Sequence, residues 1–378
     1  MATADYKLFT PLRIDDDLEL NNRVVLGPLT RARSDAHGLV NELNQLYYEQ
    51  RAGAGLVITE ATAVSEQGFG WYRAPAMYTP AHADAWRHVV DRVHRQHGTI
   101  FMQMWHMGRQ GHSSFNAKRE LVSASALRLE QGHTRNANGA AVPYETPRAL
   151  ETHELANVVD AYRQSAQLAK QAGFDGVEIH AANGYLIDQF LQSVTNQRTD
   201  AYGGSFENRS RLLIEVVEAI QTVYPATRIG VRLSPNGAFG GMGSPDNFAM
   251  FTYTMERLRA YDLAYVAILD GLGFGFHDKD QLMTAFDAKM AFRGRVLANN
   301  SYTRDIAEGV VRSGAADFVG FGRLFMANPD LAQRFQNDWP LATKPKYEMY
   351  WDPKKGAMGY TEFPAYEPEA GTTEKATE

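Results

Sequence analysis

The chain has 378 residues, of which 44% are hydrophobic and 22% are charged, a composition typical of globular proteins with a large core. With a formal net charge of -6 and scattered Lys and Arg residues, it offers no basic surface for nucleic acid. The absence of cysteine excludes disulfides, thiolate catalysis and Cys-based metal sites. No apolar run is long enough to span a bilayer and the first residues lack a secretory pattern, so we expect a cytoplasmic protein that does not bind membranes.

Short apolar runs rich in β-branched residues recur along the chain, and we expect each to form a strand. They span 24–27, 55–61, 99–105, 176–180, 229–234, 264–269, 295–299 and 317–322. Segments of helical periodicity lie between most of them, at 42–51, 83–96, 154–171, 207–223, 247–261 and 303–313. This alternation predicts βαβ units, and the number of strands suits a closed (β/α)8 TIM barrel of the α/β class.

The predicted domain organisation is a single barrel over 1–366, followed by a flexible tail over 367–378 that has little to bury. The segment 108–150 is too long for a plain connection and predicts a lid or excursion, and 237–244 predicts a second one. An open doubly wound sheet would also alternate strands and helices. No G-x-G-x-x-G follows the first strand, however, which counts against a Rossmann dinucleotide site.

Active sites of (β/α)8 barrels form at the carboxyl ends of the strands, so the residues that follow each predicted strand carry the functional information. Most of them are polar hydrogen-bonding groups, and neither a hydrolytic carboxylate pair nor a metal-ligand cluster is among them. We therefore expect no metal. They are Thr30, Ala61, Gln103, Trp105, His180, Asn183, Tyr185, Arg232, Asn299, Asn300, Gly322 and Arg323.

His180, Asn183 and Tyr185 fall within one turn after the strand at 176–180. His and Asn can both hydrogen-bond a carbonyl oxygen that gains negative charge in a transition state, and a protonated Tyr can donate a proton. The structural alternative is that His180 ends a strand, Asn183 caps a helix and Tyr185 packs in the core.

Two further features predict an anionic ligand. Gly320 and Gly322, with Arg323, follow the last strand, where many barrels bind phosphate, and the run from Ala298 would complete the cup; a turn with a solvated arginine is the alternative. Arg232 lies within a predicted buried strand, where a guanidinium needs an anionic partner. That partner could be Glu178, or a cofactor that becomes anionic on reduction.

These residues lie in motifs that resemble the Old Yellow Enzyme family of FMN-dependent ene-reductases over about the first 365 residues. The motifs are RVVLGPLTRAR, GLVITEAT, FMQMWHMGR, HAANGYLIDQFLQ, YGGSFENRSRL, GVRLSP and FGRLFMANPDL. Within the family the chain is similar to 12-oxophytodienoate reductases. Thr30 makes it resemble the branch of the family that has threonine at this position, where another branch has cysteine.

The resemblance implies tightly but non-covalently bound FMN. Thr30 would bind the flavin carbonyl near N5, Gln103 the pyrimidine edge, and Arg232 would offset charge near N1. The remaining cofactor contacts implied for the ring are Pro28, Leu29 and Ala61, and those for the phosphate are Asn300, Ser301, Gly322 and Arg323. The family often has glycines where this chain has Asn300 and Ser301, which makes the local turn a departure.

The resemblance also implies a ping-pong reaction, in which a nicotinamide and a small alkene bind the same pocket in turn. The implied nicotinamide is NADPH, with NADH as the alternative. His180 and Asn183 would bind a carbonyl or nitro oxygen while hydride passes to the β-carbon, and Tyr185 would protonate the α-carbon. Pocket-wall candidates are Trp105, Tyr72, Phe274, Phe276 and Tyr350, next to Met349, where the family commonly has an aromatic residue. A monomer or a homodimer is expected.

Two other functions would fit the same predicted fold. A phosphate-binding isomerase or aldolase would also hold phosphate at the last two strands and should have a Schiff-base lysine or a catalytic carboxylate at a strand end. The lysines fall in the predicted helices, loops and tail, however, and Glu178 lies within its strand two residues before His180. A noncatalytic flavin-binding protein is the other alternative. The combination of His180, Asn183 and Tyr185 favours an enzyme.

Overall fold

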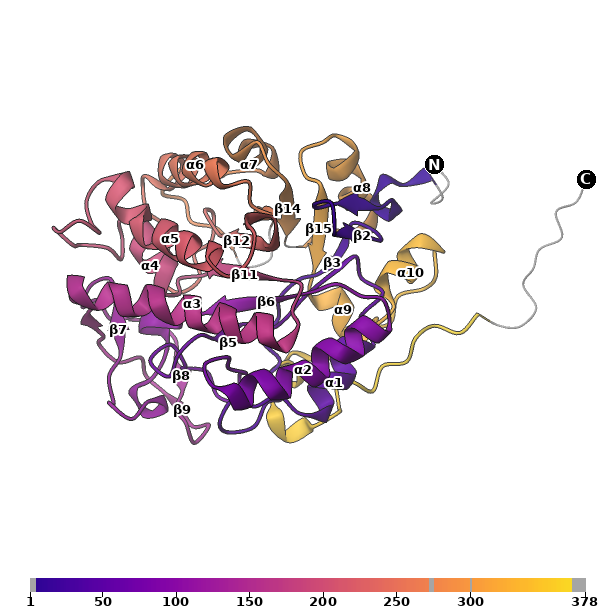
Figure 1. Ribbon diagram of the computed structural model, residues 1–378, viewed down its shortest axis with the longest axis horizontal. Helices are drawn as coiled ribbons and strands as arrows, with labels where there is room; N and C mark the ends of the chain where they lie inside the picture. Colours follow the sequence, from indigo (N-terminus) through magenta and orange to yellow (C-terminus); the bar gives the residue numbers. More distant parts are fainter. Residues whose placement is uncertain (1–4, 272–274, 300, 369–378) are drawn as a thin grey trace, which may run out of the picture.

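Parallel strands close into a barrel in the computed structural model, which describes residues 5–271, 275–299 and 301–368 (Figure 1). In order around the barrel they are β3 (Val24–Leu26), β4 (Leu56–Ile58), β6 (Ile100–Trp105), β11 (Gly176–Ala181), β12 (Ile229–Leu233), β13 (Tyr265–Leu269), β14 (Val296–Asn299) and β15 (Phe318–Phe321). Strand β15 pairs with β3, and β11 pairs with β6 as well as with β12, so no barrel strand is left as an edge. The predicted (β/α)8 barrel is confirmed, and each strand lies in its expected segment except β11, which extends one residue beyond 176–180.

Helices connect the strands on the outside of the barrel (Figure 1). Those expected from periodicity are α1 (Glu42–Glu49), α2 (Pro80–Arg95), α3 (Leu155–Ala172), α5 (Phe206–Gln221), α6 (Asn247–Leu258) and α8 (Arg304–Arg312). Helix α2 begins three residues earlier than predicted because Thr79 caps it in a capping box with His82, and Pro80 follows the cap. A further helix, α4 (Leu186–Leu191), begins directly after Tyr185. The sequence analysis missed three helices of only five to eight residues: α7 (Ala285–Phe292), α9 (Arg323–Ala327) and α10 (Leu331–Gln336).

The predicted excursion at 108–150 forms small sheets of its own. It contains η3 (Gly108–Gln110), η4 (Ser113–Phe115), the parallel pair β7 (Val122–Ser123) and β10 (Arg148–Ala149), and the antiparallel pair β8 (Thr134–Arg135) and β9 (Ala141–Val142). The other short elements are β5 (Thr62–Ala63), η2 (Lys7–Phe9), η5 (Thr152–Glu154), η6 (Ala226–Arg228), η7 (Arg259–Tyr261), η8 (Tyr347–Met349) and η9 (Pro353–Lys355).

The barrel interior is filled at its amino-terminal end. A hairpin of β1 (Leu12–Arg13) and β2 (Glu19–Leu20) packs its leucines against one apolar cluster that includes the first residues of several strands, among them Leu56 and Tyr265. Gly230 leaves room for the Tyr265 ring, because a Cβ at this glycine would lie 2.4 Å from Cζ of Tyr265. The opposite end of the barrel therefore remains available for a site.

The proposed boundaries of one domain over 1–366 and a tail over 367–378 stay predictions, and residues 369–378 lie outside the described part of the chain. Within the described residues, no helix combines the length and the hydrophobicity that crossing a membrane requires. The cytoplasmic location also stays a prediction.

We expect Gly230→Ala to lower the free energy of unfolding by about 1–3 kcal/mol, because the new methyl group would overpack against Tyr265. The matched control is Gly309→Ala in α8, where an added Cβ meets no atom within 4 Å and alanine should stabilise the helix by about 1 kcal/mol. Chemical denaturation of both variants measures the two effects. Equal stability of the Gly230 variant and the wild type would contradict the packing assigned to Tyr265.

Candidate active site at the carboxyl ends of the strands

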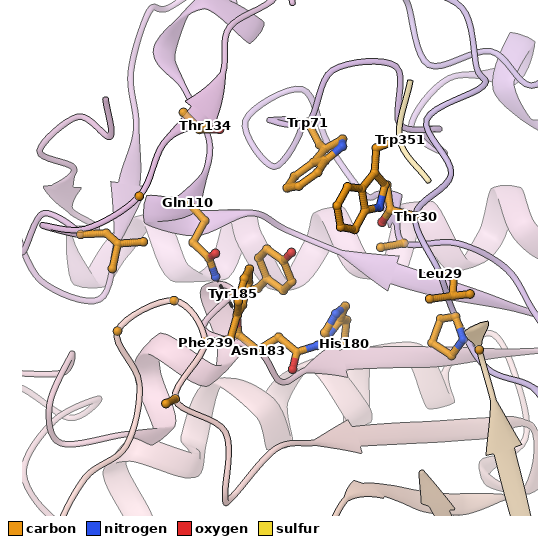
Figure 2. A pocket seen from close by; sticks show the side chains of 18 of the residues that line it. Leu29, Thr30, Trp71, Gln110, Thr134, His180, Asn183, Tyr185, Phe239 and Trp351 are labelled. Atoms are coloured by element: carbon orange, nitrogen blue, oxygen red, sulfur yellow. Dashed lines mark hydrogen bonds between the residues drawn. The ribbon is translucent and has the colours of Figure 1, made fainter. Parts of the chain in front are cut away.

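A cavity of about 1930 Å³ opens at the carboxyl ends of the barrel strands. Most of the residues that the sequence predicted for the site line this cavity. They are Pro28, Leu29, Thr30, Ala61, Gln103, His180, Asn183, Tyr185, Arg232, Ser301, Gly322, Arg323 and Tyr350. In Figure 2, Leu29 and Thr30 lie on one side of this cavity, and His180, Asn183 and Tyr185 project into it from a neighbouring segment.

The cavity floor contains a buried cation. Arg232 is 5% exposed; its Nη2 donates to Oδ1 of Asn299, whereas its Nη1 has no hydrogen-bond partner among the residues that the structure describes. Glu178, beside it, accepts hydrogen bonds from Gln103 Nε2 at 2.7 Å and from the Tyr265 hydroxyl at 3.0 Å. Burial lowers the pKa of Arg232, and the negative charge of Glu178 opposes that shift. Glu178 thus supports the cation electrostatically while one guanidinium nitrogen stays available to a ligand.

Burial raises the pKa of Glu178, and attraction to Arg232 opposes that shift. The ionised state of this carboxyl therefore depends on the arginine above it. Because an unpaired buried charge is costly, the two groups stabilise each other in the barrel interior.

His180 and Tyr185 form a second part of the site. Their rings meet edge to face with centroids 4.9 Å apart, and Trp105 packs edge to face on Tyr185 at 5.0 Å. Burial raises the pKa of Tyr185, so its hydroxyl stays protonated at neutral pH. Burial, helped by the charge of Arg232, lowers the pKa of His180 well below its usual value. Within the described part of the chain, Nδ1 of this neutral ring has no hydrogen-bond partner. The site therefore combines a neutral imidazole with a protonated phenol.

Small residues near β14 and β15 bring the backbone close to the cavity. A Cβ at Gly320 would lie 2.5 Å from Nδ2 of Asn299, the same nitrogen that donates to the Gly320 carbonyl at 2.7 Å. Ser301 has φ of 64°, a left-handed conformation that glycine adopts most readily. The turn therefore keeps a glycine-like backbone although a serine occupies it. Asn300 lies outside the described residues.

A protein-family model matches most of the chain. Residues 7–342 match the model of the NADH:flavin oxidoreductase / NADH oxidase family. The chain belongs to this family. It is accordingly an oxidoreductase, and the resemblance to Old Yellow Enzymes is confirmed.

Curated relatives and solved structures agree with this assignment. The chain is 38% identical to 12-oxophytodienoate reductase 1 of Oryza sativa subsp. japonica, with 97% of this chain and 95% of the relative covered. It superimposes on the old yellow enzyme homologue from Zymomonas mobilis with a TM-score of 0.90, 37% identity and coverage of 95% and 100%. For morphinone reductase in complex with tetrahydroNAD, the TM-score is 0.88, the identity 38% and the coverage 96% and 98%.

The family implies FMN as the cofactor, and the residues present fit such a group. The buried Nη1 of Arg232 and Nδ1 of His180 both lack a hydrogen-bond partner among the described residues, and they belong to a cavity that Gln103 and Thr30 also line. At Gly322 a Cβ would lie 3.2 Å from the side chain of Leu29, so the glycine keeps this wall open. These groups supply hydrogen-bond donors and close backbone approach, which a polar ring with a phosphate chain requires.

Three predicted pocket-wall residues do not line the cavity. Trp105 is 1% exposed and packs edge to face against Tyr185. Tyr72 packs near Gly139 of the excursion, since a Cβ there would lie 3.0 Å from Tyr72 Cε1. Phe276 is 42% exposed and pairs through its backbone with Gly237. Phe274, the fourth candidate, lies outside the described residues.

The sequence analysis missed aromatic residues that do line the cavity. Trp71 and Trp351 contact each other with ring centroids 6.3 Å apart and face the cavity on the side across from His180 (Figure 2). Arg31 Nε donates to the Tyr350 carbonyl at 3.2 Å and so holds this segment against the barrel. In the sequence, both tryptophans stand next to a tyrosine and outside the predicted helices and strands, which does not distinguish a cavity wall from core packing.

Met349, where the family commonly has an aromatic residue, packs closely against the backbone of a neighbouring turn. A Cβ at Gly359 would lie 2.7 Å from Cβ of Met349, so the methionine packs closely on a glycine with φ of 67°. Its neighbour Tyr350 supplies the aromatic ring of this part of the wall.

We expect His180 to remain neutral as the pH falls from 8 to 5, because burial disfavours its charged form. His94 should instead gain its proton above pH 6.5, because its hydrogen bond to Asp175 raises its pKa. Ring nitrogen-15 NMR shifts, assigned with His180→Gln and His94→Gln, distinguish the two.

The lowered pKa of His180 makes the stability of the fold depend on pH. A depressed pKa in the fold means that the unfolded chain binds the proton first, so the stability that depends on neutral His180 falls as the pH drops below 6.5. Protonation of His180 at or above pH 6.5 in the folded protein would contradict the buried, neutral state.

Proposed function

We propose that the protein is an FMN-dependent ene-reductase that oxidises NAD(P)H and reduces the activated C=C bond of α,β-unsaturated carbonyl or nitro compounds. The observation that carries the proposal is the position of His180, Asn183 and Tyr185 in the cavity above a buried cation, Arg232. NADPH is the proposed reductant, with NADH possible, and a small alkene is the proposed substrate.

The described residues provide a cofactor site of suitable chemistry. Thr30, Gln103 and Arg232 would hold the polar edges of the flavin ring, with the further ring contacts Pro28, Leu29 and Ala61. The proposed phosphate contacts are Asn300, Ser301, Gly322 and Arg323. When bound, FMN supplies a two-electron carrier between the nicotinamide and the alkene. The uncompensated guanidinium nitrogen of Arg232 would favour the state of the cofactor that carries negative charge.

His180 and Asn183 would activate the alkene through its oxygen. Hydrogen bonds to this carbonyl or nitro oxygen strengthen as hydride reaches the β-carbon and negative charge develops on the oxygen. A neutral His180 retains one ring N–H for this bond and leaves the other ring nitrogen as an acceptor. The site therefore stabilises developing charge without adding a second cation beside Arg232.

Tyr185 would complete the reduction by giving its phenolic proton to the α-carbon. Its raised pKa keeps the proton available at neutral pH. Hydride at one carbon and a proton at the other balance the saturation of the double bond. Nothing in this step requires a metal ion.

A shared pocket for both reactants supports alternating, ping-pong half-reactions. The solved structure of morphinone reductase contains tetrahydroNAD, which supports a nicotinamide as the reductant of this chain as well. The cavity volume of about 1930 Å³ leaves space for more than a flavin ring. A monomer or homodimer in the cytoplasm stays the expected state of the protein.

We expect Tyr185→Phe to retain reduction of FMN by NADPH but to slow reoxidation by 2-cyclohexenone about a hundredfold, because only the second half-reaction needs the phenolic proton. Anaerobic rapid mixing measures each half-reaction through the flavin absorbance at about 450 nm. The wild-type protein should bleach with NADPH and recover its absorbance with the enone.

The outcomes separate the function from the role of Tyr185. A wild-type holoprotein that neither NADPH nor NADH can bleach, or whose absorbance the enone does not restore, would contradict the ene-reductase proposal. Equal slowing of both half-reactions in Tyr185→Phe would leave the function in place but reject Tyr185 as the proton donor.

A further inference from the structure

The turn between β11 and α4 carries two of the proposed catalytic residues and has an unusual backbone. Asn183 has φ of 57°, in the left-handed region that non-glycine residues rarely adopt, and Gly184 follows with φ of 72°. Such a conformation persists only when surrounding groups determine it. What holds this turn therefore decides where the Asn183 and Tyr185 side chains lie.

Side chains bind the backbone N–H and C=O groups of both Asn183 and Gly184. The partners come from the excursion after β6, from the end of β12 and from α4. They are Ser234 Oγ on Asn183 N at 2.7 Å, Gln110 Nε2 on Asn183 O at 2.7 Å, Asp188 Oδ2 on Gly184 N at 2.8 Å, and Gln189 Nε2 on Gly184 O at 2.6 Å. Figure 2 shows the bond from Gln110 to Asn183.

Asp188 connects this turn to the second excursion. Its Oδ1 accepts a hydrogen bond from Gln192 Nε2 at 2.9 Å, and Oε1 of Gln192 accepts one from the backbone N–H of Gly243 at 2.8 Å. Oε1 of Gln192 also accepts from Asn247 Nδ2 at 3.2 Å. Asp188 and Gln192 are completely buried, so water does not compete for these bonds.

We propose that Asp188 and Gln192 are positioning residues, which fix the turn at Asn183 and Gly184 and tie it to the segment 237–244, so that Asn183 and Tyr185 address one substrate. The inference rests on the proposed ene-reductase function. It goes beyond the residues that contact the substrate or FMN, because neither Asp188 nor Gln192 lines the cavity.

The hydrogen bonds that join Gly243, Gln192, Asp188 and Gly184, which we call the relay, converge on the Asp188 carboxylate from both sides, and this explains the residue types. Donors meet Asp188 at both oxygens, so the side chain must accept twice. Gln192 cannot rotate its amide to compensate, because its oxygen is already the acceptor for Gly243 and Asn247. An amide at position 188 would therefore place a donor against another donor in either orientation.

The decisive experiment compares Asp188→Asn, Gln192→Glu and the double variant, which are nearly isosteric with the wild type. In Asp188→Asn, the new amide NH2 group faces another hydrogen-bond donor. In Gln192→Glu, the new carboxylate faces the carboxylate of Asp188. In the double variant the new amide at 188 can donate to the new carboxylate at 192, which still accepts from Gly243, while the amide oxygen still accepts from Gly184. All four hydrogen-bonding positions are then matched again.

Each single substitution should lower kcat/KM for 2-cyclohexenone on the order of 10- to 100-fold, since small displacements of catalytic groups cost this much. The double variant should return to within about threefold of the wild type, because the two effects are coupled. FMN content and the flavin absorbance spectrum should stay unchanged in all three. Burial raises the pKa of Asp188 to about 7, so assays at pH 8 keep its carboxyl ionised.

Glu308→Gln is the matched control. Glu308 is also a buried carboxyl that accepts backbone N–H bonds, from Lys7 at 3.1 Å and Leu8 at 2.9 Å, but it lies in α8 and does not line the cavity. This variant should lose stability without losing kcat/KM. If kcat/KM falls equally in the control, the loss in the Asp188 variant is explained by general destabilisation of the fold, and the inference is overturned.

Two other results would also overturn it: single variants with wild-type kcat/KM, or a double variant no better than the singles. If the wild type itself fails to reduce the enone, the proposed function fails. Amide hydrogen exchange at Gly184 and Gly243 then still tests whether the hydrogen bonds through Asp188 and Gln192 hold the turn. Both singles should speed exchange at these amides and the double variant should slow it again. Unchanged exchange in the singles would reject the relay independently of activity.

Discussion

The burial of Arg232 in the barrel interior is the interaction on which the rest of the site depends. A guanidinium taken out of water must be compensated, and here Asn299 binds one nitrogen while Glu178 supplies the opposing charge. Glu178 in turn depends on Tyr265, whose ring fits only because residue 230 is glycine. The packing of the barrel and the electrostatics of the cavity are thus parts of one arrangement. Its consequence is a guanidinium nitrogen held ready for an anionic or polar ligand.

The same cation influences the second part of the site. Together with burial it lowers the pKa of His180, so the imidazole that faces the cavity is neutral. A neutral donor beside Asn183 and a protonated Tyr185 form a set that can stabilise an oxyanion and deliver a proton. The strained turn that carries Asn183 would then need its own support, which the proposed relay through Asp188 and Gln192 supplies. The proposed chemistry of the rim would therefore depend on two groups that do not line the cavity.

Much of this could be predicted from the sequence, because a barrel places the residues after each strand at one end. Apolar runs located the strands, and His180 and Arg232 followed from them. Side-chain direction could not be predicted in the same way: Trp105 follows Gln103 at strand spacing, yet it packs against Tyr185 and does not line the cavity. The relay was also out of reach, because Gln192 and Gly243 are distant in sequence and meet only in the fold. Short helices such as α10 contain too few turns to show a period.

The most direct test of the account is the two-electron midpoint potential of FMN bound to the wild type and to Arg232→Met. If Arg232 offsets the negative charge of the reduced flavin, the variant should have a potential lower by about 30 mV or more, equivalent to about 1.4 kcal/mol. Measurement at saturating FMN separates this effect from weaker cofactor binding. An unchanged or higher potential in the variant would show that the buried cation does not act on the cofactor, and it would contradict the central claim.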